Sequence, residues 1–390
     1  MSASTRLVAT RSLRGLADGV VSVLLPAHLA ARGLGTARVG TVVTATLLGS
    51  AALTLLVGLG GLGRSRRQLL LGAAVVMVLT GVGFALPLPF WLLLVVAAVG
   101  TLNPSSGDVS VFLPLEQAAL AEGAEGAPLA RRYARWNVAG ALGGAVGALL
   151  CALPKTALGL SAQDTTWAFW LYAALGLCAV PLFLGLPDAP PPPRGQRKPL
   201  EKSREVVVRL TLLFCLDSAG SGLVLDALLA LWMSLRFGFD LQTLGAVFFV
   251  ARLLASFSQL LSPVLARRFG PVRTMVFTHL PGNLALAAAA FAPSAAWAVA
   301  LLLLRTSLSR MDAPIRQALV MDLVPREERE AAAAVTNVPR SLAAATTPAL
   351  AGLMLDGSTF GWPLVLAGLS KALYDLLLLA GVRVFERRPR

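Results

Sequence analysis

Charged residues are scarce in this chain: they make up 14% of its 390 residues, whereas an average soluble protein contains about 25%. Hydrophobic residues make up 56%. The sequence also lacks the short segments of alternating apolar and polar residues that build a membrane β-barrel. It contains instead long apolar runs of about 20 residues, the length that a helix needs to cross a bilayer. These features predict an all-α polytopic membrane protein.

Cysteine, histidine and several catalytic motifs are also rare or absent. The three cysteines, Cys151, Cys178 and Cys215, all lie in apolar runs, where they are expected as small buried side chains and not as a disulfide set or a metal cluster. Neither the phosphate-binding G-x-x-x-x-G-K-[ST] loop nor H-E-x-x-H occurs. We expect the two histidines, His28 and His279, to be buried or interfacial, with a proton relay as the alternative. The sequence therefore predicts no cofactor, no metal and no enzyme.

Acidic residues are fewer than basic ones, 20 against 34, and the net charge is +14. The arginines and lysines gather in alternate loops, at 63–67, 130–135, 194–204, 266–273, 325–329 and 382–390. This alternation is the positive-inside pattern and not a nucleic-acid-binding surface. It predicts a protein integral to the cytoplasmic (plasma) membrane, with both termini in the cytoplasm. The N-terminal stretch has no uninterrupted apolar core before Arg14 and Asp18, so we expect no cleavable signal peptide.

The apolar runs predict twelve spanning helices. Their expected ranges are 8–31, 38–62, 68–86, 90–120, 129–153, 166–187, 206–234, 241–265, 272–292, 296–323, 331–355 and 362–383. Residues 188–205 contain four consecutive prolines followed by basic residues, which cannot continue a helix. We therefore expect this segment to be a cytoplasmic linker between two six-helix bundles, 1–187 and 206–390.

The two halves resemble a parallel repeat at an offset of 200 residues. "LPLEQAAL" (113–120) aligns with "APIRQALV" (313–320), and the same offset continues into the next helix. The matching pairs are Pro114 with Pro314, Gln117 with Gln317 and Asn137 with Asn337. Transporters built from parallel repeats bind substrate near the midplane, between the repeats.

The six-plus-six plan, with a basic central loop and basic loops after the second and eighth helices, resembles the major facilitator superfamily. "GLGGLGRSRR" (58–67) is similar to that family's G-x-L-A-D-R-x-G-R-R loop. It keeps Gly58, Arg66 and Arg67, and Leu62 stands at the aspartate position. The second copy, "PVLARRFGPV" (263–272), has Arg267 at that position.

"GALGGAVGALL" (140–150) is similar to the glycine-rich fifth helix of exporters in this family. Its small residues also suit close helix packing, which is the alternative reading. The resemblance implies alternating access by two rocking bundles, without ATP hydrolysis.

Polar and charged residues lie inside the predicted spans, where an exposed charge would cost about 2.5–3.5 kcal/mol on insertion scales. They must therefore face the protein interior. We predict that they line a substrate or proton pathway, and the alternative is that they are structural ion pairs or polar packing contacts. In the first half they are Arg14, Asp18, Asn103, Asp108, Glu116, Gln117 and Asn137. In the second half they are Asp217, Asp226, Arg252, Arg310, Asp312, Arg316, Gln317, Asn337 and Arg340.

Spacing suggests particular partners for some of these charges. Arg14 and Asp18 are four residues apart, as are Lys371 and Asp375, so each pair can meet on one helix face. We expect the first pair near the central cavity and the second near the cytoplasmic end of its helix.

The predicted tenth helix carries three charges around a proline. Asp312 and Arg316 can share a face, whereas Arg310 lies about 200° around the helix from Asp312. Arg310 therefore needs another partner, and we expect Asp217 or Asp226 to provide it.

These observations favour a secondary active transporter that works as a monomer in the lipid bilayer and exports a small amphipathic molecule against proton entry. Asp18, Asp108 or Asp217 would carry the proton, because burial favours the protonated carboxyl group. One alternative is uptake or exchange of an anionic metabolite held by intramembrane arginines. Another is a non-transporting sensor or an intramembrane enzyme, although Ser221 in "AGSGL" is its only candidate nucleophile.

Overall fold

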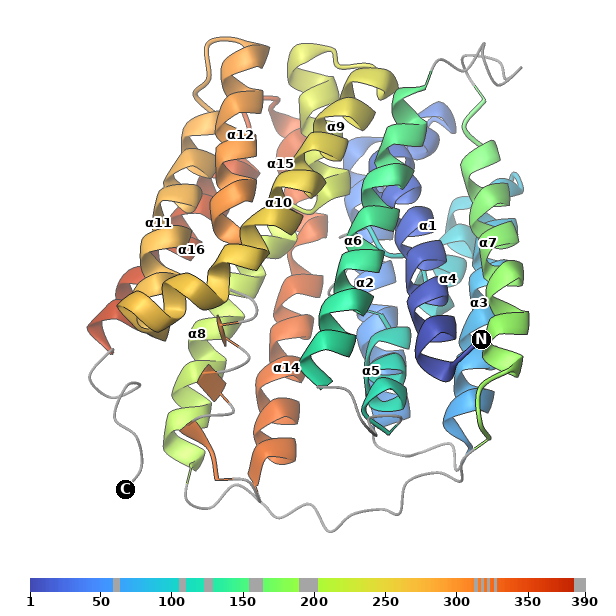
Figure 1. The fold of residues 1–390 in the computed structure, drawn as a ribbon. Coiled ribbons are helices and arrows are strands. Elements are labelled where there is room, and N and C mark those ends of the chain that lie inside the picture. Colours follow the sequence, from blue (N-terminus) through green and yellow to red (C-terminus); the bar gives the residue numbers. More distant parts are fainter. Residues whose placement is uncertain are drawn as a thin grey trace. The chain divides into compact units, whose positions relative to one another are not determined.

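A computed structural model describes residues 1–58, 64–104, 110–122, 129–153, 164–188, 203–311, 315–316, 319–320, 323–325 and 328–381. Within these ranges the regular structure is helical. The helices group into two compact units (Figure 1). Unit 1 comprises Met1–Arg194 and Leu225–Arg252, and unit 2 comprises Gly195–Val224 and Leu253–Arg390.

Unit 1 is organised around its first helix. Its helices are α1 (Ala3–Ala31), α2 (Thr36–Gly58), α3 (Arg66–Ala85), α4 (Phe90–Val99), α5 (Phe112–Glu122), α6 (Leu129–Ala152), α7 (Trp167–Leu184), α9 (Asp226–Phe237) and the first part of α10 (Leu241–Phe269). The α1 helix packs against α6, α7 and α9, while α3 packs against α7 and α2 against α4. Since α1 contacts so many neighbours, its polar residues are enclosed by protein.

Unit 2 is organised around α11 (Pro271–Ala289) and α16 (Trp362–Ala380), which lie side by side (Figure 1). Its other helices are α8 (Arg204–Leu223), the remainder of α10, α12 (Ala295–Ser309), α14 (Arg329–Thr346) and α15 (Pro348–Gly357). The α8 helix packs against α14 and α16, and α12 packs against α11.

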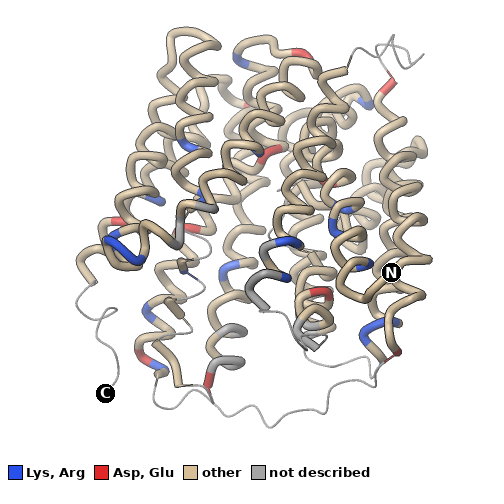
Figure 2. The backbone as a smooth tube through the Cα atoms, in the orientation of Figure 1, with Lys and Arg blue, Asp and Glu red and all other residues tan. Residues whose placement is uncertain are grey.

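Seven helices of the described chain are long and apolar enough to cross a membrane. They are α1, α2, α3, α7, α8, α10 and α16, and they coincide with seven of the twelve predicted spans. Along these helices most of the tube carries no charged residue (Figure 2). Large apolar side chains also point outward, among them Leu79, Leu177 and Leu212, each more than 60% exposed. Such surfaces suit lipid and not water.

The structure interrupts three of the predicted spans. The expected helix 90–120 is divided into α4 and α5, 206–234 into α8 and α9, and 331–355 into α14 and α15. Continuous helices were therefore wrong at these places. Pro348 opens α15 and cannot donate a backbone hydrogen bond, and two glycines close to the end of α8 weaken that helix.

The predicted span 296–323 is also interrupted, because α12 finishes at Ser309 with Arg310 as its C-cap, and helical residues recur at 315–316, 319–320 and 323. Asp312, Pro314 and Gln317 lie outside the described residues, as do Asp108, Leu62 and most of the predicted linker.

Glycines bring α1 and α6 into close contact. A Cβ atom on Gly15 would overlap the backbone of Gly140, and one on Gly19 would overlap the backbone of Gly144. Gly147 lies in the same way against the backbone of α1. The glycine-rich stretch thus serves close helix packing, the alternative that the sequence had left open.

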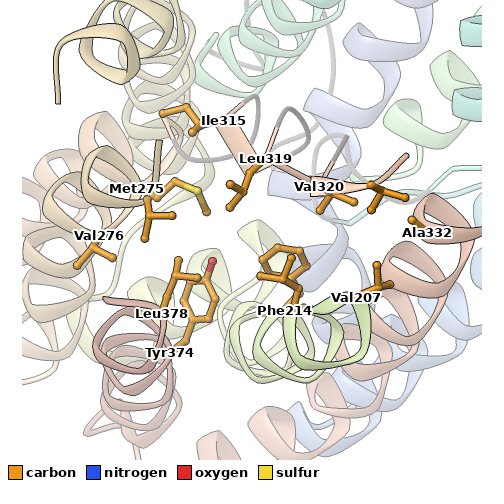
Figure 3. Close-up of a cluster of buried hydrophobic side chains, with 13 residues drawn as sticks. Val207, Phe214, Met275, Val276, Ile315, Leu319, Val320, Ala332, Tyr374 and Leu378 are labelled. Carbon is orange, nitrogen blue, oxygen red and sulfur yellow. The ribbon is translucent and has the colours of Figure 1, made fainter. Parts of the chain in front are cut away.

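The core of unit 2 is a cluster of thirteen buried apolar residues (Figure 3). Val207 and Phe214 come from α8, Met275 and Val276 from α11, and Tyr374 with Leu378 from α16. The Phe214 and Tyr374 rings lie 6.3 Å apart, and Tyr374 meets the ring of His279 edge-on. This apolar core adjoins the charged residues of the same helices.

The α1–α6 contact gives a first prediction. Replacing Gly19 with alanine should lower the thermal unfolding midpoint in detergent, because overpacking costs about 1–3 kcal/mol. The matched control is Gly72→Ala on the exposed face of α3, where an added Cβ meets nothing within 4 Å. That change should leave the midpoint unchanged or raise it slightly. Equal midpoints for the two variants would show that the α1–α6 contact is looser than described.

Candidate functional site

A buried polar stripe runs along one face of α1. Thr10, Arg14, Asp18 and Ser22 follow at intervals of four residues, which places successive members within about 40° of each other around the helix. All four are buried. The charged stripe on α1 is therefore enclosed by other helices and needs partners from them.

Glu116 on α5 provides the first of these partners. Its side chain has no exposed surface, and its Oε2 atom lies 2.5 Å from Nη2 of Arg14. Thr10 donates a hydrogen bond to Oε1 at 3.1 Å, and the indole N–H of Trp136 donates one to Oε2 at 2.9 Å. The Arg14 guanidinium also lies 4.3 Å from the centre of the Phe112 ring. Each charge thus has an oppositely charged partner inside the protein, and the Glu116 carboxylate accepts two further hydrogen bonds.

The expected pairing of Arg14 with Asp18 is wrong, because the salt bridge of Arg14 is with Glu116. The two helices α1 and α5 are in contact, so a carboxylate from another helix takes the position that sequence spacing assigned to Asp18. Asp18 instead lies among the charges of Arg14, Arg11 and Arg252, with the side chain of Asn103 close to it.

Arg252 on α10 completes the cluster in unit 1. Its Nη2 atom donates to Ser22 Oγ at 2.6 Å and to Asp226 Oδ2 at 3.0 Å. Asp226 is the first residue of α9, where the helix dipole favours a negative charge. The cluster therefore joins α1, α5, α9 and α10 through three carboxylates and three arginines: Asp18, Glu116, Asp226, Arg11, Arg14 and Arg252.

Unit 2 contains a second charged cluster, centred on Asp217 of α8. Lys371 Nζ lies 2.6 Å from Oδ1 of Asp217, and Arg316 Nη1 lies 3.3 Å from Oδ2. His279 Nε2 approaches Oδ1 to 3.8 Å. Asp217 therefore receives two cations and faces an imidazole.

Asp375 of α16 occupies the other side of this imidazole. His279 Nδ1 lies 2.9 Å from Oδ1 of Asp375, and Asn283 Nδ2 donates to Oδ2 at 2.8 Å. The expected pair of Lys371 with Asp375 is therefore wrong, since each residue bonds to a different helix. Lys371 contacts α8 and Asp375 contacts α11.

The two carboxylates predicted as partners of Arg310 pair with other residues. Within the described chain, Asp217 pairs with Lys371 and Arg316, and Asp226 pairs with Arg252. Arg310 itself is half-buried at the end of α12. The early end of α12 removes the continuous helix on which the prediction relied.

Ser221, the candidate nucleophile, lies 2.7 Å from Lys371 Nζ. A serine–lysine pair can act in catalysis only if the lysine is deprotonated and removes the hydroxyl proton. Here Oδ1 of Asp217 lies 2.6 Å from the same amino group. Lys371 is therefore placed as an ion-pair partner of Asp217 as well as a neighbour of Ser221.

The remaining predicted site residues lie apart from the two clusters. Gln117 is half-buried, and its carbonyl accepts a hydrogen bond from Tyr133. Asn137 and Asn337 have exposed side chains, and Arg340 is half-buried on α14. Asp108, Asp312 and Gln317 fall outside the described residues.

The structure adds members that the site prediction omitted. They are Thr10, Arg11 and Trp136 in unit 1, and His279, Asn283, Lys371 and Asp375 in unit 2. A usable signal was present for four of them. His279 and Asn283 are four residues apart within one apolar helix, as are Lys371 and Asp375 in another, so each pair shares a face. The sequence gives no signal that these two pairs meet across the helices.

The helices are suited to a bilayer, and each unit encloses a cluster of buried charges. These two features are typical of polytopic membrane proteins that act as transporters. The family model of the Major Facilitator Superfamily matches residues 7–311. The chain belongs to this superfamily, and it is a secondary transporter integral to a membrane. The resemblance drawn from the loops and the six-plus-six plan is thereby confirmed.

Similar proteins agree with this assignment. The uncharacterized membrane protein YJR124C of Saccharomyces cerevisiae is 25% identical over 406 residues, covering 94% of this chain and 91% of that protein. The crystal structure of the nucleoside transporter NupG is similar with a TM-score of 0.70 at 14% identity, covering 100% of both chains. The inward-open structure of the xylose transporter XylE from E. coli is similar with a TM-score of 0.71 at 17% identity, and the match covers 99% of this chain and 97% of that one. At these identities the two solved structures show a shared fold alone.

The Arg14–Glu116 pair gives a second prediction. Glu116→Gln keeps the shape of the side chain but leaves the Arg14 charge buried, which should cost about 3–5 kcal/mol of stability. The control is Glu205→Gln, which removes a solvent-exposed pair with Arg209 worth about 0–1 kcal/mol. Thermal unfolding in detergent compares the two. A loss no greater than that of the control would show that water or lipid headgroups reach Arg14.

Proposed function

We propose that this transporter exports a small amphipathic molecule in exchange for protons, and that Asp18 carries the proton. The observation that supports the proposal is the commitment of the charges around Asp18. Arg14 is bound to Glu116 and Arg252 to Asp226. Asp18 interacts with both arginines through their charge, without a salt bridge to any described residue.

A proton carrier must lose and regain its charge without unfolding the site around it. Protonating Glu116 or Asp226 would break a salt bridge. Protonating Asp18 breaks none among the described residues, and the amide of the nearby Asn103 offers both a donor and an acceptor to the neutral acid. Of the three carboxylates considered from sequence, Asp217 is held by Lys371 and Asp108 lies outside the described residues. Asp18 is thus the best-supported carrier.

Transport of an anionic metabolite remains the alternative proposal. It rests on arginines that could bind a carboxylate or phosphate in a fork geometry. Two of them already bind protein carboxylates: Arg252 binds Asp226, and Arg316 binds Asp217. An anionic substrate would have to displace these partners, so the observations favour the first proposal.

The proposal includes a setting for this chemistry. The protein acts as a monomer in the plasma membrane, and two bundles (1–187 and 206–390), joined by the cytoplasmic linker 188–205, alternate access to the substrate. The basic loops support this orientation. One segment, Leu225–Arg252, groups with unit 1 although it follows the linker.

The proton role of Asp18 gives a third prediction. Inverted membrane vesicles are acidified, and the pH gradient is followed by acridine orange while ethidium, tetraphenylphosphonium or succinate is added. We expect an amphipathic cation to dissipate the gradient with the wild-type protein. Asp18→Asn should reduce this at least tenfold, since an amide cannot carry the proton, while leaving the unfolding midpoint nearly unchanged.

The matched control is Asp240→Asn, the same change at an exposed carboxylate before α10. Hydrogen bonds from the Thr243 side chain and backbone hold the pKa of Asp240 below its ordinary value, so it stays ionised across the assay. Its substitution should not change the flux. If the Asp18→Asn variant dissipated the pH gradient as fully as the wild-type protein, another carboxylate would carry the proton. If only succinate dissipated the gradient, the anion alternative would be favoured.

The orientation gives a fourth prediction. In a background without the three native cysteines, Gly195→Cys in the linker should react with an impermeant maleimide only from the cytoplasmic side. Ser203 is a poor labelling site, because it is buried and its backbone N–H donates to Glu328. Leu34→Cys, between α1 and α2, serves as the control for the opposite side. Labelling of position 195 from outside intact cells would reverse the proposed topology.

A further inference from the structure

We infer that His279 is a proton-binding site in unit 2, and that its protonation weakens the ion pair between Lys371 and Asp217. The inference rests on the proposed proton coupling for its role in transport, but its geometry stands independently. The imidazole lies between two carboxylates: Nδ1 is 2.9 Å from Asp375 Oδ1, and Nε2 is 3.8 Å from Asp217 Oδ1. The ring is only 4% exposed.

The two contacts of the ring are not equivalent. An ionised Asp375 can only accept hydrogen bonds, so the Nδ1 atom at 2.9 Å carries the proton of the neutral ring. The amide nitrogen of Asn283 lies 3.1 Å from Nδ1 and 2.8 Å from the second oxygen of Asp375, and in this tautomer it donates to the carboxylate. The Nε2 atom then presents a lone pair to Asp217, and two electron-rich atoms do not form a hydrogen bond. The 3.8 Å separation agrees with this arrangement.

A second proton on the ring changes the contact with Asp217. It converts Nε2 into a donor directed at Oδ1, and this oxygen is the atom that Lys371 binds at 2.6 Å. The imidazolium and the ammonium group then compete for one acceptor. Lys371 retains other acceptors, because Ser221 Oγ lies 2.7 Å from Nζ and the carbonyl oxygen of Asp217 lies 3.3 Å away. The amino group can therefore shift without losing all its hydrogen bonds.

Protonation of the His279 ring changes the net charge of the whole cluster. With a neutral ring, two carboxylates face two cations; with a protonated ring, one positive charge is in excess. The charged groups around the ring are Asp217 from α8, Lys371 and Asp375 from α16, and Arg316 from the segment after α12. The α12 helix also packs against α11, and its one charged residue is Arg305. The excess positive charge weakens the attraction that holds Lys371 and Arg316 on the single carboxylate Asp217.

The inference can be measured by NMR because the chain contains few histidines and few lysines. The chain contains two histidines and four lysines. The protein, labelled with ¹⁵N-histidine and ¹⁵N-lysine and placed in lipid nanodiscs, is followed by NMR between pH 8.5 and 5. His279→Gln and Lys371→Arg assign the two signals. His28 serves as an internal reference, since its ring contacts Thr165 and the Phe84 carbonyl and faces no carboxylate at hydrogen-bonding distance among the described residues.

We expect His279 to occupy the Nδ1–H tautomer at pH 8.5 and to become imidazolium within this range. The Lys371 Nζ signal should shift with the same midpoint. Asp375→Leu should convert the neutral ring to the Nε2–H tautomer, whereas Asp356→Leu, at an exposed carboxylate of the same unit, should not. If Asp375→Leu does not fold, the wild-type spectra alone decide.

An Nε2–H tautomer at pH 8.5, a ring that stays neutral at pH 5, or a Lys371 signal that ignores the His279 midpoint would each overturn the inference. The measurement needs no substrate, which separates it from the flux assay. Proton-coupled flux with an unresponsive His279 would refute only this inference. A titrating His279 in a protein without proton-coupled flux would refute only the proposed function.

Discussion

A charge removed from water must be compensated within the protein, and this requirement organises both units. Glu116 has no exposed surface, yet Arg14, Thr10 and Trp136 supply the opposite charge and the hydrogen bonds that water would provide. Asp217 receives Lys371 and Arg316 in the same way. Because a single unpaired charge in an apolar interior costs several kcal/mol, each of these side chains constrains the helix that carries its partner.

Close packing makes such pairing possible. Arginine and lysine reach their partners only if the helices approach, and α1 approaches α6 because glycines face glycines at the contact. The same approach brings Trp136 of α6 to Glu116 of α5 and to Arg11 of α1, whose guanidinium lies 4.5 Å from the indole. Small residues therefore act on the charged site indirectly, by setting the distance between the helices that present it.

The two clusters differ in how they can respond to a proton. In unit 1 Arg14 pairs with Glu116 and Arg252 with Asp226. Protonating Asp18 would therefore break neither of these salt bridges. In unit 2 the carboxylates are held by cations or amides, and a histidine stands between them. One cluster thus suggests a carboxylate as its proton site, and the other suggests an imidazole whose proton redistributes an existing ion pair.

The sequence alone determined the class of protein, the helical fold and the transporter family. Long apolar runs need no tertiary information, because a helix satisfies its own backbone hydrogen bonds in lipid. It also located most of the buried charges, since their cost requires burial. Only the tertiary structure decided their partners: Arg14 with Glu116, Lys371 with Asp217, and Asp375 with His279. Spacing of four residues predicts which side chains share a face, but a long side chain pairs with whichever opposite charge the neighbouring helix brings within reach.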